Sequence, residues 1–223
     1  MPSSSHHQVS QILEWIIQLR PASVLDVGVG TGKYGFLCRE ALDTPLASEP
    51  RRLTLHGIEG FESYIGDIQR LVYDEIMIGD CLEVLAGRNQ SYDLALLIDV
   101  IEHLEKPDAL VLLKRLLETS RNLIIATPYG FAPQDDIFGN SLEIHRSGWV
   151  KKDFEGYPDR IAVKIEHKLL CVIGKDVPTL RKAVRKGKLL RIMQQNRVVQ
   201  LGFAAAKAVG LTDVGLVRKK LGF

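Results

Sequence analysis

The sequence has little cysteine and no long run of apolar residues. Its three cysteines, Cys38, Cys81 and Cys171, stand inside apolar patterns without Cys-x-x-Cys spacing. We therefore expect reduced, buried thiols rather than disulfides or a zinc site. No apolar run approaches the roughly 20 residues that a membrane span needs, and the N-terminus has no apolar signal core. These absences predict a soluble, cytoplasmic protein.

Acidic residues are scarce near the C-terminus. Residues 176–223 carry 11 Lys and Arg against two acids, although the net charge of the whole 223-residue chain is only +2. We predict one α/β domain over residues 1–175 and a basic helical extension over residues 176–223. The extension has three interpretations: the solvated face of a packed helix, contact with an anionic membrane surface or lipid-linked substrate, or contact with RNA. Its apolar residues also allow a homodimer.

Residues 23–35 organise the chain. They read Ser-Val-Leu-Asp-Val-Gly-Val-Gly-Thr-Gly-Lys-Tyr-Gly, a short apolar strand followed by three alternating glycines and a helical pattern that we expect Thr31 to cap. The glycines remove the side chains that would keep a ligand from the backbone. Lys33 replaces the third glycine of a dinucleotide fingerprint, and Asp26 disfavours a pyrophosphate but tolerates an amino-acid tail. The stretch predicts a site for a nucleoside-type cofactor other than NAD.

Apolar strands alternate with amphipathic helices along the chain. Strands are predicted over residues 24–27, 53–59, 75–79, 92–99, 122–127, 160–165 and 168–174, and helices over residues 8–20, 31–42, 61–72, 80–85, 107–117 and 147–155. This alternation predicts a doubly wound, Rossmann-like, mostly parallel sheet. Only two residues separate the last two strands, so they pair as an antiparallel hairpin. The long segment over residues 129–146 predicts a functional lid.

Acidic residues stand at or near the ends of the first four predicted strands. They are Asp26, Glu59, Asp80 and Asp99. Ligands of open α/β sheets bind outside the carboxyl ends of the strands. A ribose diol suits Glu59, and an adenine amino group suits Asp80, because each needs a hydrogen-bond acceptor. Phe61 or Cys81 can pack on the adenine ring.

Four motifs follow one another in the order Asp-Val-Gly-Val-Gly-Thr-Gly, Gly-Ile-Glu-Gly-Phe, Ile-Gly-Asp-Cys and Leu-Ile-Asp-Val-Ile-Glu-His-Leu. In this order they resemble the motifs of class I S-adenosylmethionine (SAM) methyltransferases over roughly residues 9–175. The resemblance implies a seven-stranded sheet with a reversed C-terminal hairpin, glycines along the methionine part of SAM, Glu59 on the ribose and Asp80 at the adenine. The predicted cofactor-binding residues are Asp26, Gly28, Gly30, Gly32, Glu59, Gly60, Phe61, Asp80, Cys81 and Asp99.

A second group of polar residues follows the fourth predicted strand. Asp99, Glu102 and His103 fall within about one helical turn, and His145 ends the predicted lid. The group resembles the Glu-x-x-Glu-His and distal His-x-x-x-Trp arrangement of metal-dependent small-RNA 3′-terminal 2′-O-methyltransferases and, more loosely, the quinone O-methyltransferases, with Asp99 in place of the first glutamate. These four residues are candidate ligands for Mg²⁺ or Mn²⁺.

Two alternatives to a metal site remain. Without a metal, His103 or His145 is the predicted general base. In the other alternative, Glu102 and His103 only orient the loop that carries them, and His145 keeps its role towards the substrate.

We predict a SAM-dependent methyltransferase that methylates a hydroxyl of a small molecule, sugar or lipid-linked glycan. The choice of acceptor follows from Gly-Lys-Tyr-Gly-Phe and His-Arg-Ser-Gly-Trp, which resemble bacterial methyltransferases of glycan or secondary metabolism. Two other functions stay open, an RNA ribose 2′-O-methyltransferase and a non-catalytic SAM-binding module that regulates a partner. Methylation of nitrogen also stays open.

Overall fold

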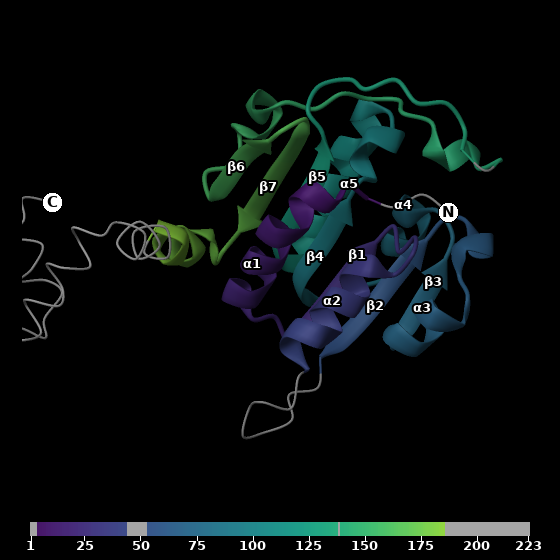
Figure 1. The fold of residues 1–223 in the computed structure, drawn as a ribbon, viewed down its shortest axis with the longest axis horizontal. Helices are drawn as coiled ribbons and strands as arrows, with labels where there is room; N and C mark the ends of the chain where they lie inside the picture. The colour runs from purple at the N-terminus through teal and green to yellow at the C-terminus, as the bar shows by residue number, and fades with distance from the viewer. Residues whose placement is uncertain (1–3, 44–52, 138, 186–223) are drawn as a thin grey trace, which may run out of the picture. The chain divides into compact units, whose positions relative to one another are not determined.

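A seven-stranded sheet organises the residues that the computed structural model describes, which are 4–43, 53–137 and 139–185. Its order is β3-β2-β1-β4-β5-β7-β6 (Figure 1). The strands are β1 (Ser23–Val27), β2 (Thr54–Glu59), β3 (Glu75–Ile78), β4 (Tyr92–Ile98), β5 (Ser120–Pro128), β6 (Arg160–Ile165) and β7 (Lys168–Gly174). β1 to β5 run parallel, whereas β7 pairs antiparallel with β5 and β6. The predicted doubly wound sheet with a reversed hairpin is confirmed.

Helices cover both faces of this sheet. They are α1 (Val9–Leu19), α2 (Lys33–Leu42), α3 (Asp67–Val72), α4 (Cys81–Ala86) and α5 (Lys106–Thr119), with the 3₁₀ turns η1 (His6–Gln8), η2 (Glu62–Tyr64), η3 (Ile101–His103), η4 (Ser141–Glu143) and η5 (Lys151–Phe154). Figure 1 shows α1 and α2 in front of the sheet and α4 and α5 behind it. Burial on both faces explains why β4 reads as a continuous apolar run, since each residue from Leu94 to Leu97 is fully buried.

Three local predictions differ from the structure. The single helix predicted over residues 61–72 is two elements, η2 and α3, because Ile65 and Gly66 between them are extended. Gly32, rather than Thr31, is the N-cap of α2, and no side chain caps that helix. The helix predicted over residues 147–155 is only the short turn η5, because Trp149 bridges to the backbone of residues 129 and 130 instead.

The three cysteines are free thiols, with Cys38 and Cys171 buried and Cys81 half-buried. No helix among the described residues has the length and apolar character that a bilayer crossing requires.

The chain divides into two units, residues 1–180 and 181–223. In the first unit, Asp176 accepts hydrogen bonds from Arg121 (2.6 and 2.7 Å) and Asn122 (2.9 Å), and Val177 and Leu180 are buried. In the second unit the structure describes residues 181–185, which are helical. Most of the predicted basic extension, and with it the predicted membrane, RNA and homodimer contacts, lies outside the described residues.

Two leucines of α5 test the assignment of its buried face. Leu116 is fully buried against the sheet, whereas Leu110 is 48% exposed on the same helix. We expect Leu116→Ala to lower the free energy of unfolding by about 2–5 kcal/mol, because it leaves a cavity. The matched control Leu110→Ala should change it by less than about 0.5 kcal/mol. Urea unfolding followed by circular dichroism measures both, and equal effects would contradict the assigned face.

Candidate active site

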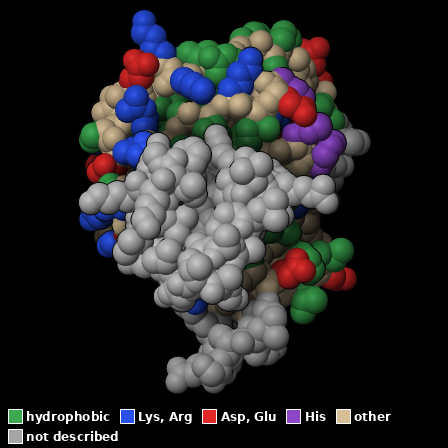
Figure 2. All heavy atoms as spheres, turned by 60° about the vertical axis from the view of Figure 1, so that its left-hand side comes forward, with side chains coloured by type: hydrophobic (Ala, Val, Ile, Leu, Met, Phe, Trp, Pro, Cys, Tyr) green, Lys and Arg blue, Asp and Glu red, His purple; other side chains and the backbone are tan. Residues whose placement is uncertain are grey.

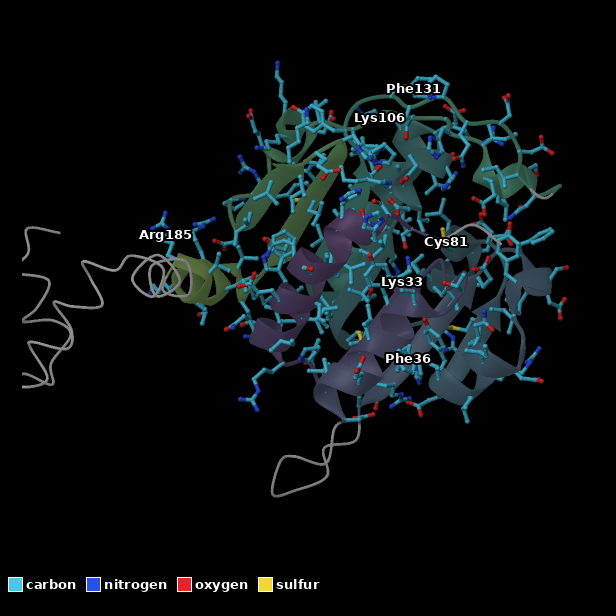
Figure 3. All side chains as sticks on the ribbon, viewed as in Figure 1. Lys33, Phe36, Cys81, Lys106, Phe131 and Arg185 are labelled. Carbon is cyan, nitrogen blue, oxygen red and sulfur yellow. The ribbon has the colours of Figure 1, made fainter. Side chains whose placement is uncertain are left out.

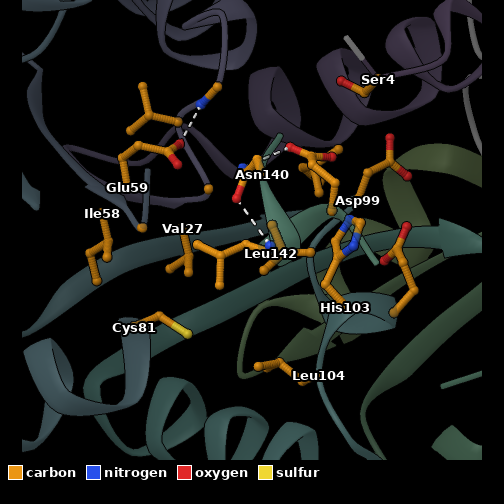
Figure 4. Close-up of a pocket in the computed structure, with 18 of the residues that line it drawn as sticks. Ser4, Val27, Ile58, Glu59, Cys81, Asp99, His103, Leu104, Asn140 and Leu142 are labelled. Atoms are coloured by element: carbon orange, nitrogen blue, oxygen red, sulfur yellow. Dashed lines mark hydrogen bonds between the residues drawn. The ribbon is translucent and has the colours of Figure 1, made fainter. Parts of the chain in front are cut away.

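The carboxyl ends of the parallel strands open into a cavity of about 680 Å³ (Figure 4). This volume lies in the range of small-molecule sites, and the strand ends are where open α/β sheets bind ligands. Of the predicted site residues, the cavity is lined by Gly28, Gly30, Glu59, Gly60, Asp80, Cys81, Asp99, Glu102, His103 and His145. Asp26, Gly32 and Phe61 are not among its lining residues.

The turn after β1 requires glycine at two positions for different reasons. Gly28 has φ +87°, and a Cβ there would lie 2.3 Å from Cγ2 of Val100. Gly30 has φ +50°, and a Cβ there would meet no atom within 4 Å, because this part of the backbone faces the cavity. The first glycine therefore permits close packing under the turn, and the second leaves the backbone accessible to a ligand.

Glu59 ends β2 and is only 7% exposed. Its Oε2 accepts a hydrogen bond from the Gly30 amide (2.8 Å), which Figure 4 draws, and its Oε1 accepts one from the Phe61 amide (2.9 Å). These two bonds fix the carboxylate between the glycine turn and the end of β2. Each carboxylate oxygen keeps further acceptor capacity, so the pair can accept two hydroxyl hydrogens of a diol.

The wall around Asp80 combines one acceptor with apolar surface. Asp80 is the N-cap of α4 and accepts hydrogen bonds on Oδ1 from the amides of Leu82 (2.8 Å) and Glu83 (3.2 Å). Burial raises the pKa of the Cys81 thiol to about 12, so this side chain stays neutral near pH 7. Asp80 therefore offers Oδ2 as an acceptor beside a neutral sulfur.

Tyr64 and the lid residue Leu142 line the cavity where Phe61 was predicted to do so. The Phe61 ring packs edge-on against Tyr64, with 4.9 Å between the ring centroids, and Tyr64 is the one that lines the cavity. Leu142 lies over Gly60, where a Cβ would be 2.7 Å from its Cδ1. No pattern in the sequence pointed to Tyr64 or Leu142, because their positions depend on the break before α3 and on the path of the lid.

Asp26 lies behind the glycine turn rather than in the cavity. It is 2% exposed, and Tyr73 donates a hydrogen bond from its hydroxyl to Oδ2 (2.6 Å). Burial raises the pKa of Asp26 to about 7, and the Tyr73 bond opposes this shift. The same Tyr73 ring lies against Gly35 and Gly57, where a Cβ would be 2.3 Å and 3.1 Å from its atoms. Asp26 thus supports the turn from within the protein.

Asp99 is held by two residues that the sequence did not single out. It follows β4 with φ +53°, and its Oδ1 pairs with Lys168 Nζ (2.7 Å) while Oδ2 accepts from Gln8 Nε2 (2.9 Å). Lys168 comes from the start of β7 and Gln8 from the N-terminal turn η1. Both contacts span long sequence separations, so only the pairing of β7 with β5 and the packing of α1 bring these residues to Asp99.

Three of the four predicted metal ligands converge. Glu102, His103 and His145 each offer one ligand atom, and these atoms lie within 4.8 Å of one another. Asp99 lies outside this group, because its carboxylate is occupied by Lys168 and Gln8. The imidazole rings of His103 and His145 are 4.9 Å apart between centroids. Figure 4 shows His103 beside Asp99 in the cavity.

The surroundings of these three side chains leave ligand atoms free. Glu102 is 2% exposed, and its Oε2 has no hydrogen-bond partner among the described residues. Burial and the nearby Asp99 carboxylate raise the pKa of Glu102. Nδ1 of His103 faces the Ile144 carbonyl (3.3 Å), and Nδ1 of His145 bonds the Ala132 carbonyl. With Nδ1 donating in both rings, each Nε2 carries a lone pair.

The predicted lid, residues 129–146, lines the cavity and is tied to η3. The carbonyl of Glu102 accepts hydrogen bonds from the amides of Arg146 (2.8 Å) and Ser147 (3.0 Å). The Ser147 hydroxyl donates to the Ile101 carbonyl (3.2 Å) and accepts from Nε1 of buried Trp149 (2.9 Å). These bonds bring His145 from a distant part of the sequence to His103.

Three further histidines are exposed and lie close together, and none of the three lines the cavity; Figure 2 shows histidine side chains gathered at the surface. The His6 and His7 rings are 3.9 Å apart, and the His7 and His167 rings are 6.1 Å apart. His7 pairs with Glu166 at 3.1 Å.

No family model matches the sequence, and no curated protein matches it. Solved structures do share the fold. The methyltransferase domain of bacterial CtHen1 is 20% identical, with a TM-score of 0.51 over 76% of this chain and 98% of that one. The N-terminal domain of EvdMO1, solved in the presence of SAH and D-fucose, is 14% identical, with a TM-score of 0.53 over 78% and 84% of the two chains.

A SAM-dependent methyltransferase from Archaeoglobus fulgidus is 13% identical, with a TM-score of 0.52 over 77% of this chain and 95% of that one. The strand order and these likenesses define the fold. The chain has the class I SAM-dependent methyltransferase fold.

The buried carboxyl of Asp26 predicts a pH-dependent stability. Its pKa of about 7 in the folded protein exceeds the ordinary aspartate value of 3.8, so the native state binds this proton more tightly than the unfolded state. The contribution of this proton to the free energy of unfolding is therefore fully present below about pH 4 and is lost as the pH rises through 7. We expect Asp26→Asn to stabilise the protein at pH 8 by about 2–4 kcal/mol, with little effect at pH 4.5.

Urea unfolding of wild type and variant at both pH values measures this difference. The exposed Asp67→Asn is the matched control and should show no such change between the two pH values. An Asp26→Asn variant that is destabilised equally at pH 4.5 and pH 8 would contradict a protonated, buried carboxyl.

Proposed function

We propose that this protein transfers the methyl group of SAM to a hydroxyl oxygen of an acceptor. One observation supports this proposal above others. The same cavity is lined by the glycine turn and Glu59 on the side of the strand ends and by His103 and His145 on the side of the lid. Groups that suit a nucleoside cofactor thus share one space with groups that accept a proton.

The residues present fit SAM. The open backbone at Gly30 accommodates the methionine part, Glu59 accepts from both ribose hydroxyls, and Oδ2 of Asp80 accepts from the adenine amino group. When bound, SAM supplies a methyl group that is already activated by its sulfonium. The protein then has to hold the acceptor oxygen in line with that methyl group and to remove the hydroxyl proton.

His145 and His103 are the proposed bases for this proton. His145 is oriented by its Nδ1 bond to the Ala132 carbonyl, which leaves Nε2 as the acceptor. Burial, together with the neighbouring His145, lowers the pKa of His103, so this imidazole is neutral near pH 7 and able to accept a proton.

The Glu102, His103 and His145 group also fits a divalent cation. The unpartnered Oε2 of Glu102 is buried, and backbone carbonyls fix both imidazoles with Nε2 as the ligand atom. One carboxylate and two imidazoles favour Mn²⁺ over Mg²⁺, which prefers oxygen ligands. A bound cation would lower the pKa of a coordinated acceptor hydroxyl.

RNA ribose methylation is the second candidate function. The convergence of Glu102, His103 and His145 favours it, because this group resembles the metal-binding set of small-RNA 2′-O-methyltransferases. A sugar or lipid-linked glycan remains the acceptor that we prefer from the sequence. We also keep the prediction of a cytoplasmic location.

Loss of Glu59 tests the proposed cofactor site. We expect Glu59→Ala to weaken binding of S-adenosylhomocysteine (SAH) by about 100-fold, because two hydrogen bonds to a charged group are lost. Isothermal titration calorimetry measures this, and the exposed Glu62→Ala is the matched control, with affinity within about twofold of wild type. Glu59→Gln, which keeps one side-chain oxygen for the Gly30 amide, separates lost binding from lost folding. A wild-type protein that binds no SAH would refute the proposed function.

Binding of Mn²⁺ tests the metal hypothesis without any acceptor. We expect one Mn²⁺ site in the wild type, detected as loss of the free Mn²⁺ signal in electron paramagnetic resonance, because three ligand atoms already converge. His145→Ala should lower the Mn²⁺ affinity at least tenfold, about the effect of losing one ligand. His167→Ala at the surface is the matched control. If the wild type binds no Mn²⁺ at millimolar concentration, proton transfer by the histidines alone is the remaining mechanism.

A further inference from the structure

A second hollow adjoins the candidate active site. It has a volume of about 570 Å³, and Glu105 and Arg146 line both this hollow and the cavity. Its other walls come from residues 106–107, 130–131, 147–148, 150 and 153. Figure 3 labels Phe131 and Lys106 in this region, at the lid end of the sheet. A ligand can therefore occupy the hollow and reach the cavity past two polar side chains.

The Phe131 ring is held at the surface of this hollow. It is 59% exposed, and its backbone is closely packed, because a Cβ on Gly148 would lie 2.6 Å from the Phe131 nitrogen. The preceding amide, that of Gly130, donates to the Trp149 carbonyl (2.7 Å), and Trp149 is fully buried. The backbone that carries the ring is thus closely packed, whereas the ring itself is exposed and contributes little to the core. Phe131 therefore offers an exposed aromatic side chain to a ligand in the hollow.

The charges around Phe131 are balanced. Lys106 Nζ pairs with Asp153 (2.8 Å) and donates to the Gly148 carbonyl (3.2 Å). The backbone of Arg146 is fixed by its bond to the Glu102 carbonyl, whereas the guanidinium of Arg146 and the carboxylate of Glu105 are exposed and have no partner among the described residues. Two cations and two carboxylates give no net charge, which disfavours a polyanion such as RNA.

We propose that this hollow is the acceptor subsite and that it binds a neutral sugar ring. The aromatic ring of Phe131 can pack against the C–H groups on one face of a sugar. The guanidinium of Arg146 can donate hydrogen bonds to the sugar hydroxyls, and the carboxylate of Glu105 can accept hydrogen bonds from them. Arg146 directly follows His145, so a ring held by Arg146 and Glu105 presents its hydroxyls to the lid side of the cavity. The proposal deepens the proposed function and rests on it, because it assigns the acceptor of the same methyl transfer.

Saturation-transfer NMR with SAH-saturated protein tests the subsite. The probes are methyl α-D-glucopyranoside, methyl β-D-galactopyranoside and D-fucose. Each is titrated to about 50 mM, which is taken as the highest concentration at which weak binding still reports on a specific site. We expect at least one sugar to bind and Phe131→Ala to weaken it about tenfold. Phe36→Ala is the matched control, because Phe36 is 57% exposed on α2 and lines neither cavity. Arg146→Gln should weaken the same sugar about tenfold through the loss of its charged donors.

Calorimetry of SAH with each variant separates this proposal from the proposed function. SAH affinity unchanged in Phe131→Ala, with sugar binding lost, supports the subsite. SAH binding without binding of any of the three sugars, or sugar binding that survives Phe131→Ala and Arg146→Gln, overturns the subsite alone. The wild type could instead bind no sugar but bind a uridine decanucleotide in a salt-sensitive way that Phe131→Ala abolishes. This result overturns the proposal that the hollow binds a sugar and favours RNA as the acceptor. Absence of SAH binding in the wild type overturns both proposals.

Discussion

Parallel pairing of β1 to β5 is the constraint on which the rest of the structure depends. Parallel strands direct their carboxyl ends to one edge of the sheet. Glu59 at the end of β2, Asp80 after β3 and Asp99 after β4 therefore meet around the glycine turn that follows β1. The helices cover both faces of the sheet, and the reversed hairpin extends it beyond β5, so this edge stays open. The cavity is thus a direct consequence of the direction of the strands.

Backbone hydrogen bonds connect the two halves of the site. The Glu102 carbonyl accepts the amides of Arg146 and Ser147, so the end of the lid is fixed to the turn after β4. This contact sets the position of His145 beside His103. It also places the exposed guanidinium of Arg146 at the boundary between the cavity and the second hollow. Proton transfer, metal binding and acceptor binding, as proposed, all depend on this attachment of the lid.

Buried charge is distributed unevenly around the glycine turn. The Asp99 carboxylate is compensated by Lys168 and bonded by Gln8, whereas the partner of buried Asp26 among the described residues is the Tyr73 hydroxyl. Burial without a cation raises the pKa of Asp26, since the charged form is poorly solvated. Two acids that look equivalent in the sequence therefore differ in their electrostatic environment. One faces a ligand cavity with a paired charge, and the other supports the turn from inside.

The sheet, the glycine turn and the acidic residues of the cavity could be predicted from the sequence alone. Alternating apolar segments predict strands and helices, and the residue that ends each parallel strand is known once the strand is known, which is why Glu59, Asp80 and Asp99 were identified. Local patterns could not show that residues 65–66 break a helix, or that Asp26 points away from the cavity. Only the tertiary structure decided that Lys168 and Gln8 hold Asp99, and that Phe131 and Arg146 share a hollow. These contacts depend on long-range packing, which no spacing in the sequence encodes.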